Sequence, residues 1–401
     1  MAIEQYKVEI TPLEKDNTYA SEAIDVTEYT RLDGVTDIIE QVDDGDFDLG
    51  VFTLDSVKLR MINFSGKFSD VNSASSIFPF RRDLAKVVIT FLDDDGNPDA
   101  QFRGFIDDTL TREDFDNAEV ALTVISKSGL FNKIAVLGGS VSNNMTIKEA
   151  LTEILDRPQV TNYLNYDIAN MNPALNIEVN AGAEFDNITY RDALNTLMRI
   201  SGSVLLVDSS DNIIVRDRTR NNNTPHKFYN EGDPLGRVNI NRLAQFNTGV
   251  QRAFNFYKID NIFAKDDNLI AENGLRQKDL SLNNIITNVD TRQVIVNYYL
   301  DNFAVPKTEL QIQMETDIAK DVEILDTCTL DYLPIVKMER NKVMPLVDVV
   351  EVPFDLPQVL NKRYISSNIG FKVIAKQVNI GSHTTTLKLR EIGTKAGDST
   401  L

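Results

Sequence analysis

The segment DALNTLMRISGSVLLVDSSDNIIVRDR, from Asp192 to Arg218, contains two secondary-structure patterns in succession. Its first part has the apolar spacing of an amphipathic helix, and Gly202 follows where a helix commonly ends. The next residues, VLLV, are all apolar, which is typical of a strand buried on both faces. A polar turn, DSSDN, then leads to a second strand, IIVRDR. The segment therefore predicts a helix, a glycine and a hairpin.

The helix of this segment resembles an earlier stretch of the chain. MTIKEALTEIL (Met145 to Leu155) and ITYRDALNTLM (Ile188 to Met198) agree in residue type position by position, and each begins with a threonine followed by an acidic residue at the spacing of a capping box. In the first stretch one apolar stripe is predicted to be buried: Ile147, Ala150, Leu151, Ile154 and Leu155. Pro158 is expected to end that helix. Unrelated helices can share these rules, but the agreement favours an internal duplication or a two-helix module.

Strand patterns dominate the rest of the chain. Before the helices, alternating or β-branched runs separated by polar turns predict a compact antiparallel sheet or barrel: YKVEITPL, VTDIIEQV, FDLGVFTLDSVKLRMINF, AKVVITFL, QFRGFIDD and AEVALTVIS. After the helices, RAFNFYKIDNIFA, TELQIQM, VEILDTCTL, RYISSNIGFKVIAKQVNI and HTTTLKLREI are also strand-like. Between them, DTRQVIVNYYLDNF predicts a helix that is capped by Asp290 and Gln293 and has Val294, Ile295, Tyr298 and Phe303 inward. GTKAGDSTL should be a loose tail.

The composition is that of a globular protein with an acidic surface. The 401 residues are 42% hydrophobic and 25% charged, which is enough for two or three domains with apolar cores. Acidic residues outnumber basic ones by 60 to 41, for a net charge of −19. This charge disfavours tight binding to nucleic acid or to anionic membranes. It is typical of a soluble protein, and it also suits a surface past which DNA slides without adhering.

The sequence carries no sign of export. Cys328 is the only cysteine, so an intrachain disulfide is excluded. The beginning, MAIEQYKVEI, lacks the cationic and apolar regions of a signal peptide, and no apolar run approaches the ~20 residues that span a bilayer. We therefore expect a soluble protein made in a reducing cytoplasm.

No motif in the sequence indicates catalysis, and we predict no catalytic residue, no cofactor and no metal site. Phosphate-loop, dinucleotide-binding, zinc-protease and nucleophile-elbow motifs are all missing from the sequence. His226 falls in the polar connector TRNNNTPHK and His383 in a turn, so both are predicted to be solvated loop histidines. Cys328 lies in an alternating strand, which predicts a buried and unreactive thiol.

Acidic clusters are frequent but do not have the spacing of a calcium loop. DDDGNPD, from Asp93 to Asp99, and DDGDFD, from Asp43 to Asp48, are better interpreted as turns. A glycosidase needs only two carboxylates, so sixty acidic residues leave that class open. The chain has no tryptophan, however, and sugar-binding clefts commonly use its large aromatic face.

The order of these elements resembles the phage tail hub family, which includes baseplate hubs. AKVVITFL, QFRGFIDD and AEVALTVIS are similar to the family's first β-domain, with Phe102, Gly104 and Ile106 matching its F-x-G-x-I strand. The helix, glycine and hairpin around Gly202 are similar to its middle module. The late helix and the strands after it resemble its second β-domain. Together these stretches cover most of the chain.

The resemblance implies an α+β, β-rich protein with two antiparallel β-barrel-like hub domains and an intervening small α/β module. The expected bounds are 1–135 for the first hub domain, 136–220 for the helix and hairpin module, and 221–401 for the second hub domain, which contains the helix at about 290–303. Residue 401 is expected near the end of this last domain, so a spike or hydrolase is expected on a separate chain.

The resemblance also implies a function. Family members form trimeric rings in which six similar β-domains face a six-fold tail tube and three-fold symmetry faces the spike or fibres. The expected partners are therefore two further copies of the chain, a tail tube or distal tail protein, a tip, spike or fibre protein, and the tape measure protein. The expected location is the virion tail tip, after assembly in the host cytoplasm. Two alternatives stay open: a virion-associated peptidoglycan-degrading enzyme and a host-receptor or carbohydrate-binding module.

Overall fold

The computed structural model describes residues 6–35, 38–41, 56–92, 96, 98–134, 141–168, 173–180, 182, 185, 188–207, 212–217, 226–229, 239–247, 254–282, 284–304, 309–334, 364–379 and 383–391. These residues form two compact units. Unit 1 comprises those within Met1–Thr219 and Ala253–Val305, and Unit 2 those within Arg220–Arg252 and Pro306–Ala396. The acidic stretch Asp43 to Asp48, most of the turn after Asp93, and the tail GTKAGDSTL lie outside the described residues. No described helix is long and apolar enough to cross a membrane.

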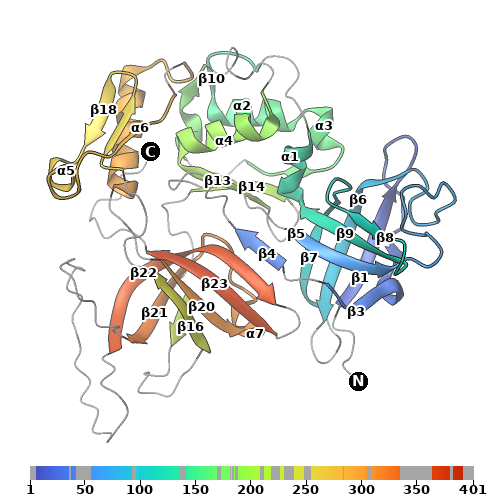
Figure 1. Cartoon of the computed structure of the whole chain (residues 1–401). Helices are drawn as coiled ribbons and strands as arrows, with labels where there is room; N and C mark the ends of the chain where they lie inside the picture. Colours follow the sequence, from blue (N-terminus) through green and yellow to red (C-terminus); the bar gives the residue numbers. More distant parts are fainter. Residues whose placement is uncertain are drawn as a thin grey trace, which may run out of the picture. The chain divides into compact units, whose positions relative to one another are not determined.

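Unit 1 begins with a curled antiparallel sheet (Figure 1, blue to teal). Its elements are β1 (Tyr6–Leu13), β2 (Ile24–Asp25), η1 (Thr27–Tyr29), β3 (Thr30–Val35), β4 (Ile38–Gln41), β5 (Ser56–Ile62), β6 (Arg81–Leu92), β7 (Pro98–Ile106), β8 (Arg112–Asp114) and β9 (Glu119–Ser126). Within Unit 1 the strand order is β2-β1-β6-β7-β9-β5, with β3 and β4 also paired to β5 and β8 to β9. The short helix η1 joins β2, at one end of this order, to β3, which pairs with β5 at the other end.

The alternating pattern of the sequence explains this sheet. Predicted strand YKVEITPL coincides with β1, where Val8 and Ile10 are fully buried and the residues between them are partly exposed. Strand β6 pairs antiparallel with β7, as expected for two strands joined by a turn at DDDGNPD, and β7 already begins at Pro98 within that stretch. Gly104 pairs with Ser126 of β9, and a Cβ at this position would collide with the carbonyl oxygen of Ile125. Only glycine therefore permits this close approach of β7 and β9.

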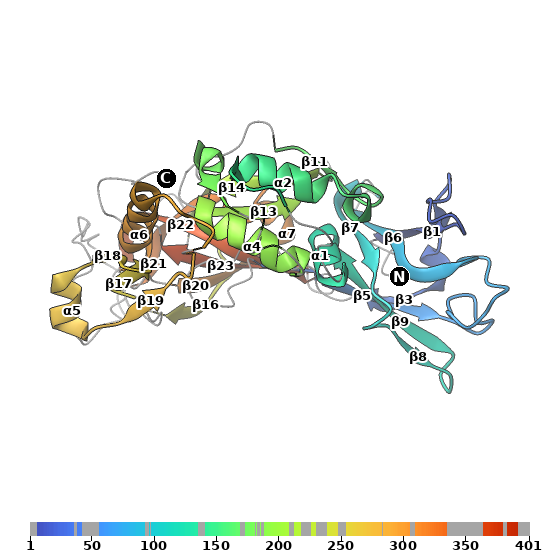
Figure 2. The same ribbon diagram turned by 90° about the horizontal axis from the view of Figure 1, so that it is seen from above.

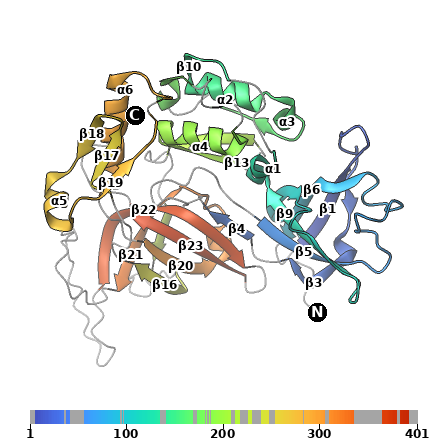
Figure 3. The ribbon, with the colours of Figure 1, turned by 45° about the horizontal axis from the view of Figure 1, so that its top comes forward.

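The predicted two-helix module follows in Unit 1. Its elements are η2 (Lys127–Gly129), α1 (Leu130–Lys133), β10 (Met145–Thr146), α2 (Ile147–Leu155), α3 (Pro158–Thr161), β11 (Asn165–Tyr166), η3 (Pro173–Asn176), β12 (Glu178–Val179), α4 (Tyr190–Ser201), β13 (Ser203–Val207) and β14 (Asn212–Asp217). Helices α2 and α4 contact each other and lie over β13 and β14 (Figures 1 and 3). Thr146 and Glu149 form the full capping box, and the five predicted stripe residues are all buried. At α4, the Thr189 side chain accepts from the Asp192 amide.

The glycine and hairpin also agree with the sequence. Gly202 ends α4 in the left-handed conformation, with φ 61°, and β13 pairs antiparallel with β14. Pro158 differs from expectation, because α2 already ends at Leu155 and the proline starts α3 instead. A proline is tolerated there since the first amides of a helix have no intrahelical acceptor.

The last part of Unit 1 is a small sheet covered by a helix. Its elements are β17 (Phe256–Ile259), β18 (Ile262–Lys265), α5 (Asp267–Asn273), β19 (Gln277–Asp279) and α6 (Val289–Phe303). The predicted single strand around residue 258 is therefore a hairpin. Helix α6 is capped by Asn288 rather than Asp290, because the Asn288 side chain accepts from two amides of the first turn. Ile295 and Tyr298 are buried as predicted and Phe303 is partly buried, whereas Val294 is 48% exposed.

The packing of α6 departs from the expected domain assignment. Sequence order placed the helix at about 290–303 in the last domain, 221–401, but its contacts group it with Unit 1. Its buried residues join the same apolar core as those of α2 and α4. Sequence order could not show this, because the partners of α6 lie about 100 residues away in the chain. The bounds 1–135 and 136–220 stay predictions.

Unit 2 is a second curled sheet (Figure 1, orange and red strands with β16). Its elements are β15 (His226–Tyr229), β16 (Arg242–Asn247), β20 (Glu309–Glu315), α7 (Thr316–Ala319), β21 (Thr327–Pro334), β22 (Tyr364–Asn379) and β23 (Thr384–Glu391). Within Unit 2 the order is β16-β20-β23-β22-β21-β15. We expected a purely antiparallel sheet, but β15 and β21 pair in parallel, so the sheet of Unit 2 is mixed. The two curled sheets and the α/β module confirm the predicted β-rich α+β class.

Candidate interaction surface

The two histidines occupy different environments from each other. His226 lies in β15 rather than in a solvated connector, and its Nε2 is 3.2 Å from Oδ2 of Asp326. Its ring stacks on Phe228 at a centroid distance of 6.3 Å. His383 is exposed just before β23, as predicted. The prediction of solvated loop histidines is therefore wrong for His226, because tertiary pairing recruits its segment into a strand.

Cys328 is the neighbour of His226 across the β15–β21 ladder and is fully buried. Burial first, and then the nearby Asp326 carboxylate, raise the pKa of this thiol far above its ordinary value. A raised pKa disfavours the thiolate that a nucleophile or metal ligand requires. The geometry thus gathers Cys, His and Asp without activating the thiol. Nor do the described residues include a group of three or more His, Cys, Asp or Glu side chains placed to hold a metal ion.

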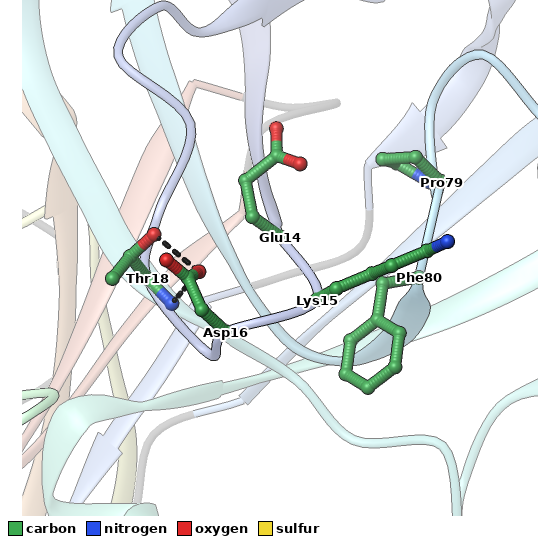
Figure 4. A pocket seen from close by; sticks show the side chains of 6 residues that line it. All are labelled: Glu14, Lys15, Asp16, Thr18, Pro79 and Phe80. Carbon is green, nitrogen blue, oxygen red and sulfur yellow. Dashed lines mark hydrogen bonds between the residues drawn. The ribbon is translucent and has the colours of Figure 1, made fainter.

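An open depression near β1 is lined by Glu14, Lys15, Asp16, Thr18, Pro79 and Phe80 (Figure 4). The Asp16 carboxylate accepts from the hydroxyl and the amide of Thr18 at 2.7 and 3.0 Å. These hydrogen bonds lower the pKa of Asp16. A glycosidase acid needs the opposite shift. Asp16 therefore does not have the electrostatic environment of a catalytic acid.

A buried arginine, Arg82, is the centre of a polar cluster in Unit 1. The Arg82 side chain, 7% exposed, donates from Nε to Asp108 at 2.6 Å and from Nη1 to Glu113 at 2.7 Å. Nη1 also donates to the carbonyl of Phe68 at 2.7 Å. Glu113 accepts further bonds from the Ser69 hydroxyl and the Asp70 amide. Arg82 therefore ties three segments together: the loop after β5, the β7–β8 turn and β8.

The charges of this cluster explain its pKa shifts. Burial raises the pKa of Asp108, and its ion pair with Arg82 only partly offsets this. Burial acts in the same direction on Glu113, but the Ser69 and Arg82 hydrogen bonds outweigh it, so the pKa of Glu113 is lowered. The guanidinium of Arg82 binds the carboxylates of both Asp108 and Glu113, so these two carboxylates stabilise the fold.

The loop between β5 and β6 is held by its own hydrogen bonds. The Asn63 side chain accepts from the Phe68 amide, and the Asn72 side chain donates to the Gly66 carbonyl. Further on, the Ser75 hydroxyl accepts from the amides of Ile77 and Phe78. Phe68 and Phe78 are buried with their rings 6.4 Å apart. The loop is thus an ordered part of the first sheet's surface.

Three large apolar side chains project from this region into solvent. Phe64, Val71 and Phe115 are 83%, 84% and 77% exposed. We call these three residues the apolar rim. Phe64 follows β5, where the Asn63 amide donates to Ala118 in the β8–β9 turn at 2.6 Å, and Phe115 lies in that same turn. Val71 follows Asp70, whose amide bonds to Glu113 of β8. The hairpin that bears Phe115 extends away from the rest of its sheet (Figure 2).

Sequence reasoning missed this surface. Phe64 is the last residue of a predicted strand, and Phe115 lies in a polar turn between two predicted strands. Neither position predicts an exposed contact surface. The combination REDFDN offered one signal, since a bulky aromatic residue between charges in a short turn has no core to enter.

Comparison with known proteins gives the fold. No family model and no curated protein sequence matches the chain. Among solved structures, the tail protein from Neisseria meningitidis MC58 is similar with a TM-score of 0.54 at 12% identity, over 97% of this chain and 96% of that one. The 43 kDa tail protein of prophage MuSo2 from Shewanella oneidensis has a TM-score of 0.51 at 9% identity, over 96% of each chain.

A chain of the Francisella PdpA–VgrG complex is similar as well, with a TM-score of 0.52 at 10% identity, over 96% of this chain and 57% of that one. The similarity runs through nearly the whole sequence and includes both curled sheets and the α/β module. The resemblance drawn from the sequence is thereby confirmed at the level of architecture: the chain has the fold of these tail proteins.

Proposed function

We propose that this chain is a non-enzymatic structural hub of a bacteriophage tail. The observation that carries the proposal is the end-to-end likeness to two tail proteins, one of them from a prophage, each covered over 96% of its length. Similarity over the whole length of both chains favours a shared structural role, because two proteins that shared only one domain would match over that domain alone. The fold by itself does not fix function, so the proposal also depends on the nature of the described surfaces.

Those surfaces favour assembly over chemistry. The described carboxylates with shifted pKa values are hydrogen-bonded or ion-paired within the protein, as at Arg82 and at Glu309. The three most exposed large apolar side chains among the described residues, Phe64, Val71 and Phe115, lie on an ordered loop and the hairpin bonded to it. Exposed apolar groups of this kind are typical of protein contacts.

In the proposed assembly three chains close a ring in the virion tail tip. Each chain supplies two curled sheets, so three chains present six similar units to the six-fold end of the tail tube. The other side would meet the tip, spike or fibre proteins, and the tape measure protein would pass through with the DNA. A closed ring leaves no unpaired interface, and its net charge of −19 per chain limits adhesion of DNA in the lumen. Assembly would take place in the host cytoplasm.

Electron microscopy tests this proposal directly. Class averages of isolated tails, with a gold-labelled tag on this chain, should show three labels around a ring at the tail tip. Purified protein mixed with tail tube should give the same ring. Label along the tail shaft, in the capsid or in no virion component would overturn the proposal.

A turbidity assay on purified peptidoglycan separates the hub from the enzymatic alternative. The hub should leave peptidoglycan intact over the whole pH range in which it is folded. Clearing that disappears on substitution of one Asp or Glu would replace the hub proposal with a hydrolase. Saturable binding of the isolated chain to host cells, without ring formation, would instead favour a receptor-binding module.

A further inference from the structure

We propose that the apolar rim of Phe64, Val71 and Phe115 is the docking surface for a second tail protein, one whose contact face has an apolar pocket bordered by Lys and Arg. This rests on the proposed function, because it takes the partner from the same tail. It goes beyond that function by assigning the contact to three named side chains and by stating the chemistry of the partner.

The first support is that the rim is pre-organised. A side chain on a loose loop loses conformational freedom when it binds, whereas one on an ordered loop has already lost much of it. Phe64 and Val71 belong to the loop held by Asn63, Asn72 and Ser75, and Phe115 belongs to the hairpin tied to that loop through Glu113. The buried Arg82 fixes the loop and the hairpin to each other.

The second support is the exposure of the side chains. Phe64, Val71 and Phe115 are each more than three-quarters exposed, on a loop and a hairpin that are joined by hydrogen bonds. Burial of such side chains supplies free energy of about 25 cal/mol per Å² of apolar surface. Aromatic residues at the centre of a contact commonly carry much of its binding energy. Leu275 is 61% exposed and lies between α5 and β19, outside this loop and hairpin.

The third support is local charge, which identifies the partner. Asp70, Asp114 and Asp116 are exposed beside the rim, and Arg112 is the one exposed cation of the described hairpin residues 112–119. A second copy that brought the same rim to the contact would set Asp70, Asp114 and Asp116 against their own counterparts, so like-charge repulsion disfavours a self-paired rim. A basic protein face is attracted instead, and its pocket would receive the aromatic side chains.

A binding series tests the proposal with proteins of the same phage. The chain is titrated against each of the other tail proteins encoded in its genome, purified singly, at low and at high salt. One of them should bind, and added salt should weaken the affinity since exposed charges are screened. The double variant Phe64→Ser, Phe115→Ser should weaken that affinity by at least about tenfold. Asp70→Asn with Asp116→Asn should reduce mainly its salt dependence.

Leu275→Ser is the matched control, because Leu275 is also strongly exposed in Unit 1 but lies on another element. It should leave the affinity unchanged, and thermal melts should show that all variants are folded. The docking proposal is overturned if no tail protein binds, if the rim variants bind as well as the wild type, or if they abolish self-association instead. The ring in electron micrographs should survive the rim substitutions. Loss of docking with the ring retained therefore tests this inference separately from the hub function.

Discussion

The hydroxyl of Tyr299 on α6 donates a hydrogen bond to the carbonyl oxygen of Arg199 in the last turn of α4, over 2.9 Å. The hydroxyl of the neighbouring Tyr298 reaches the carbonyl of Gly202 at 3.3 Å. The Arg199 carbonyl also accepts from the Gly202 amide at 3.3 Å, so the Tyr299 hydroxyl is a second donor to the end of α4. Two tyrosines from the late part of the chain thus complete the C-terminus of the repeated helix.

Removal of the Tyr299 hydroxyl should weaken this contact between the helices. Tyr299→Phe keeps the ring, so the loss should be that of one partly buried hydrogen bond, about 1 kcal/mol in the free energy of unfolding. Urea denaturation measures it. Tyr298→Phe, which removes a longer bond, should lower the stability less. Equal stability of Tyr299→Phe and the wild type would show that the bond makes no net contribution.

Gly202→Ala should destabilise Unit 1 for two reasons. The left-handed φ of 61° costs a residue with a Cβ roughly 1–2 kcal/mol, and the added Cβ would also collide with the Tyr298 hydroxyl. The total should exceed 2 kcal/mol by these two effects together. In the Tyr298→Phe background the collision is relieved in part, so the same substitution should be less harmful. A double-mutant cycle in urea checks the coupling, and additive effects would contradict the collision.

A charge on the buried stripe of either repeated helix should prevent folding. Leu151 and Leu194 are fully buried in one apolar core, so Leu151→Asp or Leu194→Asp places an unpaired carboxylate there. The expected result is insoluble protein on expression. Thr196→Asp, at a half-buried position of α4 outside the apolar core, adds the same charge and should remain soluble. Folded, soluble Leu194→Asp protein would contradict the assigned core.

Arg82→Met should destabilise the loop and hairpin in a manner that depends on pH. At neutral pH it leaves Asp108 and Glu113 ionised, partly buried and without their cation, for a loss of roughly 3 kcal/mol. Burial without the arginine raises the pKa of both carboxyls, so protonation at mildly acidic pH should restore part of the stability relative to the wild type. Urea midpoints at pH 7 and pH 5 measure this. Arg112→Met, an exposed control on β8, should show neither effect.

Glu309 should make Unit 2 sensitive to acid. Burial tends to raise the pKa of Glu309, but Arg390 at 2.7 Å and Lys388 at 3.2 Å lower it below its ordinary 4.5. A lowered folded-state pKa means that the stabilisation is fully present above pH 4.5 and is lost as pH falls through the folded-state value. Glu309→Gln should lower the free energy of unfolding by about 2 kcal/mol at pH 7. The stability of this variant should also fall less than that of the wild type as the pH is lowered below 4.5. Glu315→Gln, an exposed change on the same strand, should leave the loss of stability at acid pH as in the wild type.

Local rules sufficed for several elements. The spacing of Ile147, Leu151 and Ile154 predicted the buried face of α2, and Thr146 with Glu149 predicted where the helix begins. The same holds for β1, whose alternation places every second residue in the core. The interactions that decide these features lie within a few residues of each other, so the pattern is visible in the chain itself.

Other elements depended on distant partners. His226 was expected in a solvated connector, yet pairing with β21 makes its segment a strand and brings Asp326 to its ring. The Arg82 cluster draws residues from the β5–β6 loop, the β7–β8 turn and β8, and no spacing in the sequence connects them. The sequence also could not distinguish the residues of the apolar rim from core residues, because distant partners decide which apolar side chains are buried.

The sequence by itself determined the helix–glycine–hairpin module, most strands of the two curled sheets and the acidic character of the surface, because periodicity, capping and net charge are properties of neighbouring residues. Only the tertiary structure decided that α6 completes α4, that Arg82 locks a loop to a hairpin, and that Phe64, Val71 and Phe115 are held in water rather than buried. Those outcomes follow from which surfaces meet when the chain collapses, and that choice is made by contacts between residues far apart in sequence.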